Sequence, residues 1–174
     1  MPHPRPQLIL GVDPGYARLG WAVLQTQNSQ ERLIDCGCLQ TTASISLLAR
    51  YAAFQAFLQQ LLDHYHPQLL GLEQLIFARN VSTALPVAEV RGLVIAEALR
   101  RELMIRQFHP STIKSTITGN GRADKAAMRK MVSWQLQQDQ PPNPELATRL
   151  QTALDDTIDA IGVALTAARV PTSV

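Results

Sequence analysis

GVDPGYARLGWAV, at residues 11–23, joins two apolar runs through a short turn that begins with a carboxylate and a proline. The apolar run over 8–12 predicts a buried strand, and Asp13 ends it. The run over 20–25 predicts a second strand, and the short connection favours an antiparallel pair. A carboxylate at the edge of a core is costly unless it is paired or binds a cation. Asp13 is therefore a candidate functional residue.

The rest of the chain predicts an α/β fold in which a mixed sheet of five strands carries helices on both faces. A third strand over 33–41 completes three antiparallel strands. Helix and strand patterns then alternate, which requires a right-handed crossover and two parallel strands. The expected elements are a helix over 46–65, a strand over 69–72, a helix over 81–103, a strand over 104–108, a short helix from Pro110, a helix after an N-cap at Asp124 to about 138, a turn-rich linker QDQPPNPE at 138–145, and a helix over 156–169.

The length and composition predict one folded unit. A chain of 174 residues favours a single domain, which we place at 8–170 after a flexible N-terminal tail over 1–7. No apolar run reaches the length of a membrane span, and the Pro-rich start lacks the apolar stretch of a secretory signal. We therefore expect a cytoplasmic protein.

The net charge of +2 is unevenly distributed along the chain. Residues 79–130 hold ten Lys and Arg residues against four acidic residues, a net charge of +6, which leaves −4 for the remainder. Such asymmetry suggests that one face binds a polyanion. A solvated helical surface explains the same pattern equally well when the charge is taken alone.

Four carboxylates are expected to meet at one edge of the sheet. Asp13 and Glu73 end strands, and open sheets form their sites beyond such ends. Asp156 and Asp159 are three residues apart and share a helix face, whereas Asp155 points elsewhere. Converging carboxylates raise one another's pKa unless a cation intervenes. Oxygen ligands suit Mg²⁺ or Mn²⁺, and two such ions support phosphodiester hydrolysis; no His or Cys set has the spacing of a zinc site.

Four short motifs in this order resemble the RuvC family of Holliday junction resolvases, within the ribonuclease H-like superfold. They span about residues 8–169 and are GVDPG followed by Gly20, EQLIFARN from Glu73, HPSTIKSTITGNGRADK at 109–125, and DDTIDA at 155–160. The resemblance implies a crossover junction endodeoxyribonuclease that resolves Holliday junctions by paired symmetric nicks during recombination and repair.

The resemblance also implies the roles of individual residues. The family's catalytic acids, which bind the metal ions, are matched here by Asp13, Glu73, Asp156 and Asp159. The implied ions are two Mg²⁺ per site, and Mn²⁺ can substitute for them. Family members often place a stacking Phe three residues after the glutamate; here Ile76 holds that position and Phe77 follows, so either side chain is a candidate for the crossover contact. The residues expected to contact DNA are Ile76, Phe77, Arg79, Asn80, Lys114, Arg122 and Lys125.

The partners implied by the resemblance are four-way junction DNA, a second copy of the chain, and a branch-migration complex of the RuvA–RuvB type. The homodimer is expected to form through the helix that starts at Val81. Its apolar side contains small residues that allow close approach, and comprises Leu85, Ala88, Gly92, Ile95 and Leu99. The alternative is that this side faces its own sheet.

Three other functions share part of this pattern. An actin-like phosphotransferase also uses a D-x-G loop, but it needs two such domains around a nucleotide. A nuclease of the same superfold that acts in RNA processing would keep the acids without recognising junctions. A non-catalytic junction-binding protein would be expected to have lost at least one acid, and all four are present.

Overall fold

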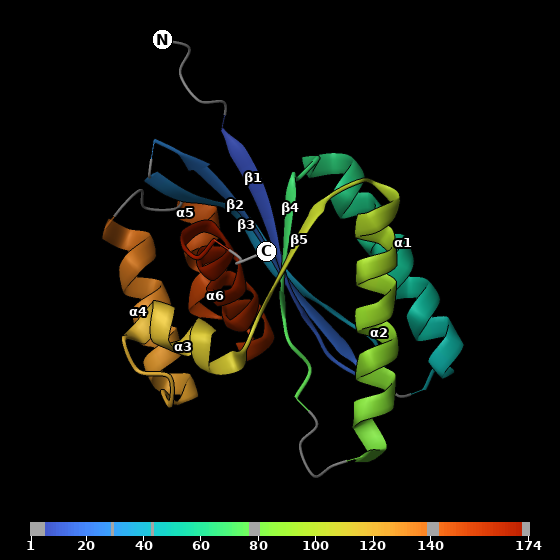
Figure 1. Ribbon diagram of the computed structural model, residues 1–174. Coiled ribbons are helices and arrows are strands. Elements are labelled where there is room, and N and C mark those ends of the chain that lie inside the picture. The colour runs from blue at the N-terminus through green and yellow to red at the C-terminus, as the bar shows by residue number, and fades with distance from the viewer. Residues whose placement is uncertain (1–5, 29, 43, 77–80, 139–142, 172–174) are drawn as a thin grey trace.

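The computed structural model describes residues 6–28, 30–42, 44–76, 81–138 and 143–171. They form one five-stranded sheet in the order β3-β2-β1-β4-β5 (Figure 1). The three antiparallel strands are β1 (Gln7–Pro14), β2 (Arg18–Gln27) and β3 (Gln30–Gln40), and the two strands parallel to β1 are β4 (Leu69–Glu73) and β5 (Met104–Phe108). The predicted mixed sheet is thus confirmed.

Helices cover both faces of the sheet, as Figure 1 shows. One face carries α1 (Leu47–Tyr65) and α2 (Val81–Arg100), and the other carries α3 (Pro110–Thr118), α4 (Lys125–Gln138), α5 (Pro144–Gln151) and α6 (Asp155–Arg169). Each face has its own apolar core. No helix in these ranges is both long enough and apolar enough to cross a membrane.

The alternation of side chains along β1 decides where its carboxylate lies. Leu10 and Val12 belong to the core beneath α1 and α2, whereas Ile9 belongs to the core beneath α6. Gly11 also faces α6. Because successive side chains of a strand point to opposite faces, Asp13 lies on the α6 face of the sheet.

Two glycines allow α6 to lie directly on the sheet. A Cβ atom on Gly20 would lie 2.0 Å from the carbonyl oxygen of Asp156, and one on Gly11 would lie 2.3 Å from that of Ala160. Both positions therefore exclude any side chain. The close approach places the first turn of α6 over the end of β1, where Asp13 is the cross-strand partner of Gly20.

The strands predicted from residues 8, 20 and 33 begin earlier, at Gln7, Arg18 and Gln30, so β1 includes the last residue of the tail expected over 1–7. Two later boundaries were also wrong. The helix expected over 81–103 ends at Arg100, because the amides of Glu102 and Leu103 bond back to Leu99 and Ala98 and Glu102 adopts a φ of 56°. This is the Schellman arrangement that closes a helix.

The second error concerns the linker predicted over 138–145, whose last residues begin helix α5. Pro144 stands in the first turn of α5, and Asn143 caps that turn by accepting a hydrogen bond from the Leu146 amide at 2.8 Å. Leu146 is fully buried in the α6-side core and anchors the helix.

Candidate active site

Parallel pairing brings the first two candidate acids side by side. Val12 of β1 is in register with Leu72 of β4, so Asp13 and Glu73 are the next residues of neighbouring strands. The alternation along β4 places Glu73 on the same face as Asp13, since Leu70 and Leu72 point to the opposite core. Asp13 and Glu73 both line a hollow of about 270 Å³ at this edge.

The other two acids come from the start of α6. Asp156 and Asp159 line a second hollow of about 320 Å³, together with Asp13. Asp13 therefore lies between the two hollows and borders both. The structure thus brings together all four carboxylates that the sequence predicted, from β1, β4 and α6.

The charges of these acids act on one another. Burial, followed by the charges of Asp159, Glu73 and Asp156, raises the pKa of Asp13 to about 7. Burial and the charge of Asp159 likewise raise the pKa of Glu73. Burial raises the pKa of Asp159 as well. A cluster of this kind is destabilised when it is ionised without a counter-charge.

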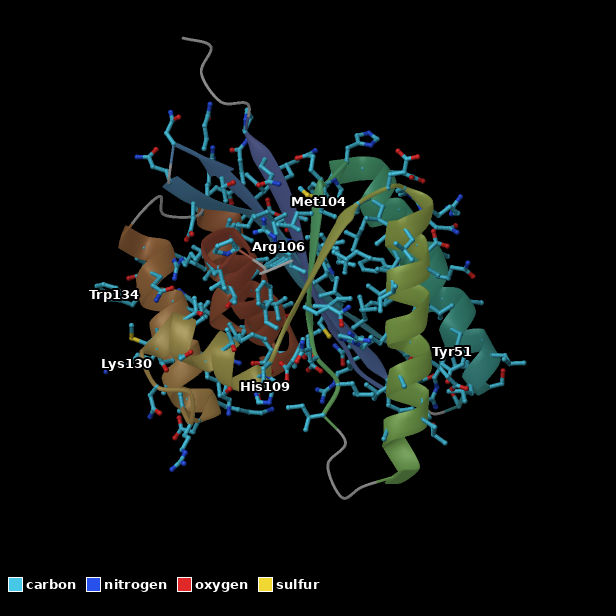
Figure 2. The ribbon with its side chains drawn as sticks, in the orientation of Figure 1. Tyr51, Met104, Arg106, His109, Lys130 and Trp134 are labelled. Atoms are coloured by element: carbon cyan, nitrogen blue, oxygen red, sulfur yellow. The ribbon has the colours of Figure 1, made fainter. Side chains whose placement is uncertain are left out.

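Two predicted lysines flank the acids and partly offset this repulsion. The charge of Lys114, on α3, lowers the pKa of both Glu73 and Asp159. The charge of Lys125, at the start of α4, lowers the pKa of Asp13 and Asp159. The helix that carries Lys114 begins after His109, which caps it by accepting from the Ser111 amide where β5 passes into α3 (Figure 2).

The turn between β1 and β2 is held on both sides. The guanidinium group of Arg50, on α1, lies 4.7 Å from the ring centroid of Tyr16, and such stacking stabilises a desolvated cation. Arg18 Nε lies 3.4 Å from Asp156 Oδ2 on the opposite side. The turn that follows Asp13 is therefore fixed between α1 and α6.

The donor set fits a hard divalent cation by its chemistry, since it consists of carboxylates that are costly to bury without one. Within the described ranges, however, no three His, Cys, Asp or Glu side chains are close enough to hold one ion as they stand. Mutual repulsion and the ion pair between Asp156 and Arg18 both favour this open arrangement.

The residues predicted to contact DNA fall into three groups. Lys114 and Lys125 lie at the carboxylates, and Ile76 is 49% exposed and lines the smaller hollow with Glu73. Arg122 is exposed and lines a different hollow beside α4. The predictions for Phe77, Arg79 and Asn80 lie outside the described residues.

Two arginines at this edge, Arg18 and Arg129, were missed by sequence reasoning. Arg18 pairs with Asp156, and Arg129 together with Lys125 binds the carboxylate of Asp155. The prediction that Asp155 points elsewhere holds only in part, because Asp155 pairs with these cations of α4 but also lines the same hollow as Asp13, Asp156 and Asp159. These contacts join segments far apart in the chain, so spacing within one element gives no signal for them.

Arg91 supports the glutamate from the other side. Its Nε donates to the carbonyl oxygen of Glu73 at 3.3 Å, and its Nη2 hydrogen-bonds to Gln107 on β5. This links α2 to the ends of both β4 and β5. The backbone that carries Glu73 is thereby held in place.

The chain is similar to known proteins over most of its length. A family model described as crossover junction endodeoxyribonuclease RuvC matches residues 9–167. The chain is 35% identical over 156 residues to crossover junction endodeoxyribonuclease RuvC of Roseiflexus sp. (strain RS-1), covering 90% of this chain and 87% of that protein. It is 36% identical over 158 residues to the protein of the same name from Prochlorococcus marinus (strain MIT 9313), covering 91% and 96%.

Solved structures share the ribonuclease H-like fold. Thermus thermophilus RuvC matches with a TM-score of 0.72 at 23% identity, over 92% of each chain. T. thermophilus RuvC in complex with Holliday junction substrate matches with a TM-score of 0.74 at 21% identity, over the same shares. The fold follows from these structures and the family from the sequence matches: this chain belongs to the RuvC family of crossover junction endodeoxyribonucleases.

Proposed function

We propose that this RuvC family nuclease resolves Holliday junctions by paired symmetric nicks, with Asp13, Glu73, Asp156 and Asp159 as its catalytic acids. The observation that carries the proposal is the convergence of these four carboxylates from β1, β4 and α6, in a chain of this family. The solved relative in complex with Holliday junction substrate supports the choice of DNA.

The carboxylates are proposed to hold two Mg²⁺ ions, for which Mn²⁺ substitutes; nucleases of this family are metal-dependent. When bound, such ions lower the pKa of a water molecule and offset the charge that develops on the phosphate. The role of the acids is to bind and orient. Glu73 and Asp13 supply oxygens from the sheet, while Asp156 and Asp159 supply them from the helix above.

The basic residues around the acids are proposed to bind the DNA strand. Lys114 and Lys125 lie on either side of the carboxylates, where their charges already act on Asp13, Glu73 and Asp159. A phosphodiester that enters the 320 Å³ hollow therefore meets the ammonium group of Lys125, which lines it. The proposed hydrolysis is attack of a water oxygen on phosphorus with no side-chain nucleophile, in which the P–O bond to one sugar oxygen breaks, the water gives up a proton and the leaving oxygen takes one up.

Residues beyond the acids are proposed to guide the junction itself. Ile76 is exposed at the rim of the smaller hollow, and we propose that it or Phe77 unstacks the crossover bases. An apolar wedge of this kind is a known way to open a base step. Arg79 and Asn80 are proposed as DNA contacts of the same segment, and Arg122 as a contact beside α4.

We propose that two copies of the chain pair through the outer side of α2. The two-fold axis that relates their two active sites would then match the two-fold symmetry of a junction. Leu85 and Leu99 are 65% and 62% exposed, and nothing lies within 4 Å of a Cβ placed on Gly92. These three residues therefore do not face their own sheet. Ile95, in contrast, is partly buried against the core.

A branch-migration complex of the RuvA–RuvB type and a cytoplasmic location are proposed on the family relationship alone. Such a complex would move the crossover along the DNA. The nuclease, which selects the junction by its structure, would then meet new base sequence at the crossover. A pull-down of purified complex by this chain on immobilised junction DNA would test the partner directly.

The test of the function uses synthetic four-way junctions, one with a fixed crossover and one with a mobile crossover. Each strand is labelled in turn, and cleavage is followed in Mg²⁺, in Mn²⁺ and in chelator. We expect nicks at symmetric positions in two opposite strands and no cutting in chelator. Cutting of RNA substrates alone would favour a role in RNA processing, and binding without cutting would favour a non-catalytic junction-binding protein.

A further inference from the structure

Beyond the four acids, we propose that Asp155 is a positioning residue that holds the ammonium group of Lys125 against the carboxylate hollow. The inference deepens the proposed function and rests on it, because Lys125 acts on the DNA only if DNA enters that hollow. Asp155 itself touches neither substrate nor metal in this proposal. It acts through the lysine.

The contacts of Asp155 form a bridge between α4 and α6. Lys125 Nζ lies 3.2 Å from one carboxylate oxygen, Oδ2, and Arg129 Nη2 lies 2.9 Å from the other, Oδ1. Lys125 and Arg129 are four residues apart on α4 and so present the same side of that helix to α6. Both oxygens of Asp155 are therefore committed to cations.

The bridge is itself anchored on the backbone. Arg129 Nη2 also donates to the carbonyl oxygen of Ala153 at 2.9 Å, just before α6 begins. The guanidinium group thus fixes the carboxylate, and the carboxylate in turn fixes the lysine. An arginine loses little freedom per hydrogen bond because its donors are preorganised in a plane, which suits it to this anchoring role.

Lys125 needs such an anchor because little else restrains it. Its side chain is 72% exposed, and a free lysine side chain samples many rotamers at low cost. Yet its charge acts on Asp13 and Asp159, and it lines the 320 Å³ hollow with them. Asp155 thus keeps a flexible cation at the place where a phosphate would bind.

A purely structural role for Asp155 is the competing explanation. Asp155 occupies the first turn of α6, where a negative charge interacts favourably with the helix dipole. However, its side chain is 48% exposed, and exposed ion pairs contribute little to stability. The test must therefore separate an effect on the reaction from an effect on folding.

Lys125 and Lys130 both belong to α4 but lie on different sides of it. Lys130 lies on the outer side of α4 together with Trp134, away from the sheet (Figure 2). It is exposed and has no ion pair within the described ranges. Lys130 therefore serves as an internal reference for an untethered lysine.

The kinetic experiment is a double-mutant cycle of Asp155→Asn and Lys125→Met. Rates are measured in single turnover with Mg²⁺ and saturating protein on a mobile junction, so that binding does not limit them. We expect Asp155→Asn to slow cleavage up to about fivefold in the wild-type background, the limit for an exposed ion pair, and less than about twofold when Lys125 is already Met, since coupled residues are not additive. Asp155→Glu, which keeps the carboxylate, should recover most of the rate.

The matched control is Asp63→Asn, which also breaks an aspartate–arginine pair, with Arg101, at 2.7 Å. It should leave the rate unchanged. Equal losses from Asp155→Asn in both backgrounds, or no loss at all, would overturn the proposal. So would a loss that follows the melting temperature across the variants, since that pattern is the one a structural role produces.

A second measurement does not depend on cleavage. The acylation of Lys125 by a limiting amine reagent is read by mass spectrometry against that of Lys130 in the same sample. Asp155→Asn should raise the Lys125 to Lys130 ratio several-fold, and an unchanged ratio would overturn the tether. If the wild-type chain cuts no junction while the ratio still rises, the proposed function fails and the tether stands.

Discussion

Replacing Asp13 with Asn should stabilise the metal-free protein while it abolishes cleavage. Burial and three neighbouring carboxylates raise the pKa of Asp13 to about 7, whereas an unfolded chain gives Asp its ordinary value of about 3.9. The ionised side chain therefore disfavours the folded state. Asn has nearly the same shape and carries no charge, so it removes that cost.

The magnitude follows from the difference between the two pKa values. A pKa difference of one corresponds to about 1.4 kcal/mol. A difference of about three between the folded and unfolded states therefore lowers the free energy of unfolding by about 4 kcal/mol at pH 8, and Asp13→Asn should restore this amount. The sign follows from linkage: the cost is complete above the folded pKa and disappears as the pH falls toward the unfolded one. At pH 5 about 1.5 kcal/mol should remain.

The assay is chemical denaturation of wild type and Asp13→Asn at pH 8 and pH 5, in chelator and in Mg²⁺. Asp63→Asn, an exposed carboxylate changed in the same way, is the control and should shift stability little at either pH. The gain from Asp13→Asn should shrink in Mg²⁺, because a cation offsets the same repulsion. No gain at pH 8, or an equal gain at both pH values, would refute the electrostatic reasoning.

The contact of α6 with the sheet, the outer side of α2 and Lys114 can each be tested by substitution. Gly20→Ala should push α6 off the sheet, so that the chain loses cleavage activity and about 1–3 kcal/mol of stability. Denaturation and junction cutting measure the two effects, and full activity would show that the close approach is dispensable. Leu85→Glu combined with Leu99→Glu should yield a monomer in sedimentation with unchanged circular dichroism, and a persistent dimer would exclude this side of α2. Lys114→Met should slow cleavage more than it weakens junction binding, whereas equal losses that vanish with salt would indicate only a diffuse basic surface.

The acids were predictable because each is marked by a local pattern. Asp13 and Glu73 end short apolar strands, and parallel pairing brings the ends of such strands to one edge. Asp156 and Asp159 share a face through helical periodicity. Motif order links the three segments, so the sequence alone predicts the whole carboxylate set.

The supporting contacts were not predictable, because they depend on how helices pack. The ion pair of Arg18 with Asp156 forms only where two glycines admit α6 to the sheet. The bridge from Asp155 to Lys125 depends on the side of α4 that faces α6. Helix α5 did have a local signal in its Asn-Pro start, but the neighbouring prolines made the stretch resemble a turn.

The open arrangement of the acids was also beyond the sequence. Convergence was predicted, but the rotamers of the carboxylates also depend on their neighbours, such as the guanidinium group of Arg18 beside Asp156. Likewise, the pattern on α2 identified an apolar side, and only the packed structure shows that Leu85 and Leu99 face outward while Ile95 is half covered.

The central claim is that the four carboxylates act as one site for junction cleavage. The most direct measurement compares single-turnover cutting of a mobile four-way junction by wild type and by Asp13→Asn, Glu73→Gln, Asp156→Asn and Asp159→Asn, with junction binding measured in parallel. We predict that every variant loses cleavage by orders of magnitude while it binds the junction at least as tightly as wild type, because negative charge near the phosphates is removed. A variant that cuts at nearly the wild-type rate would remove its residue from the site and contradict the account.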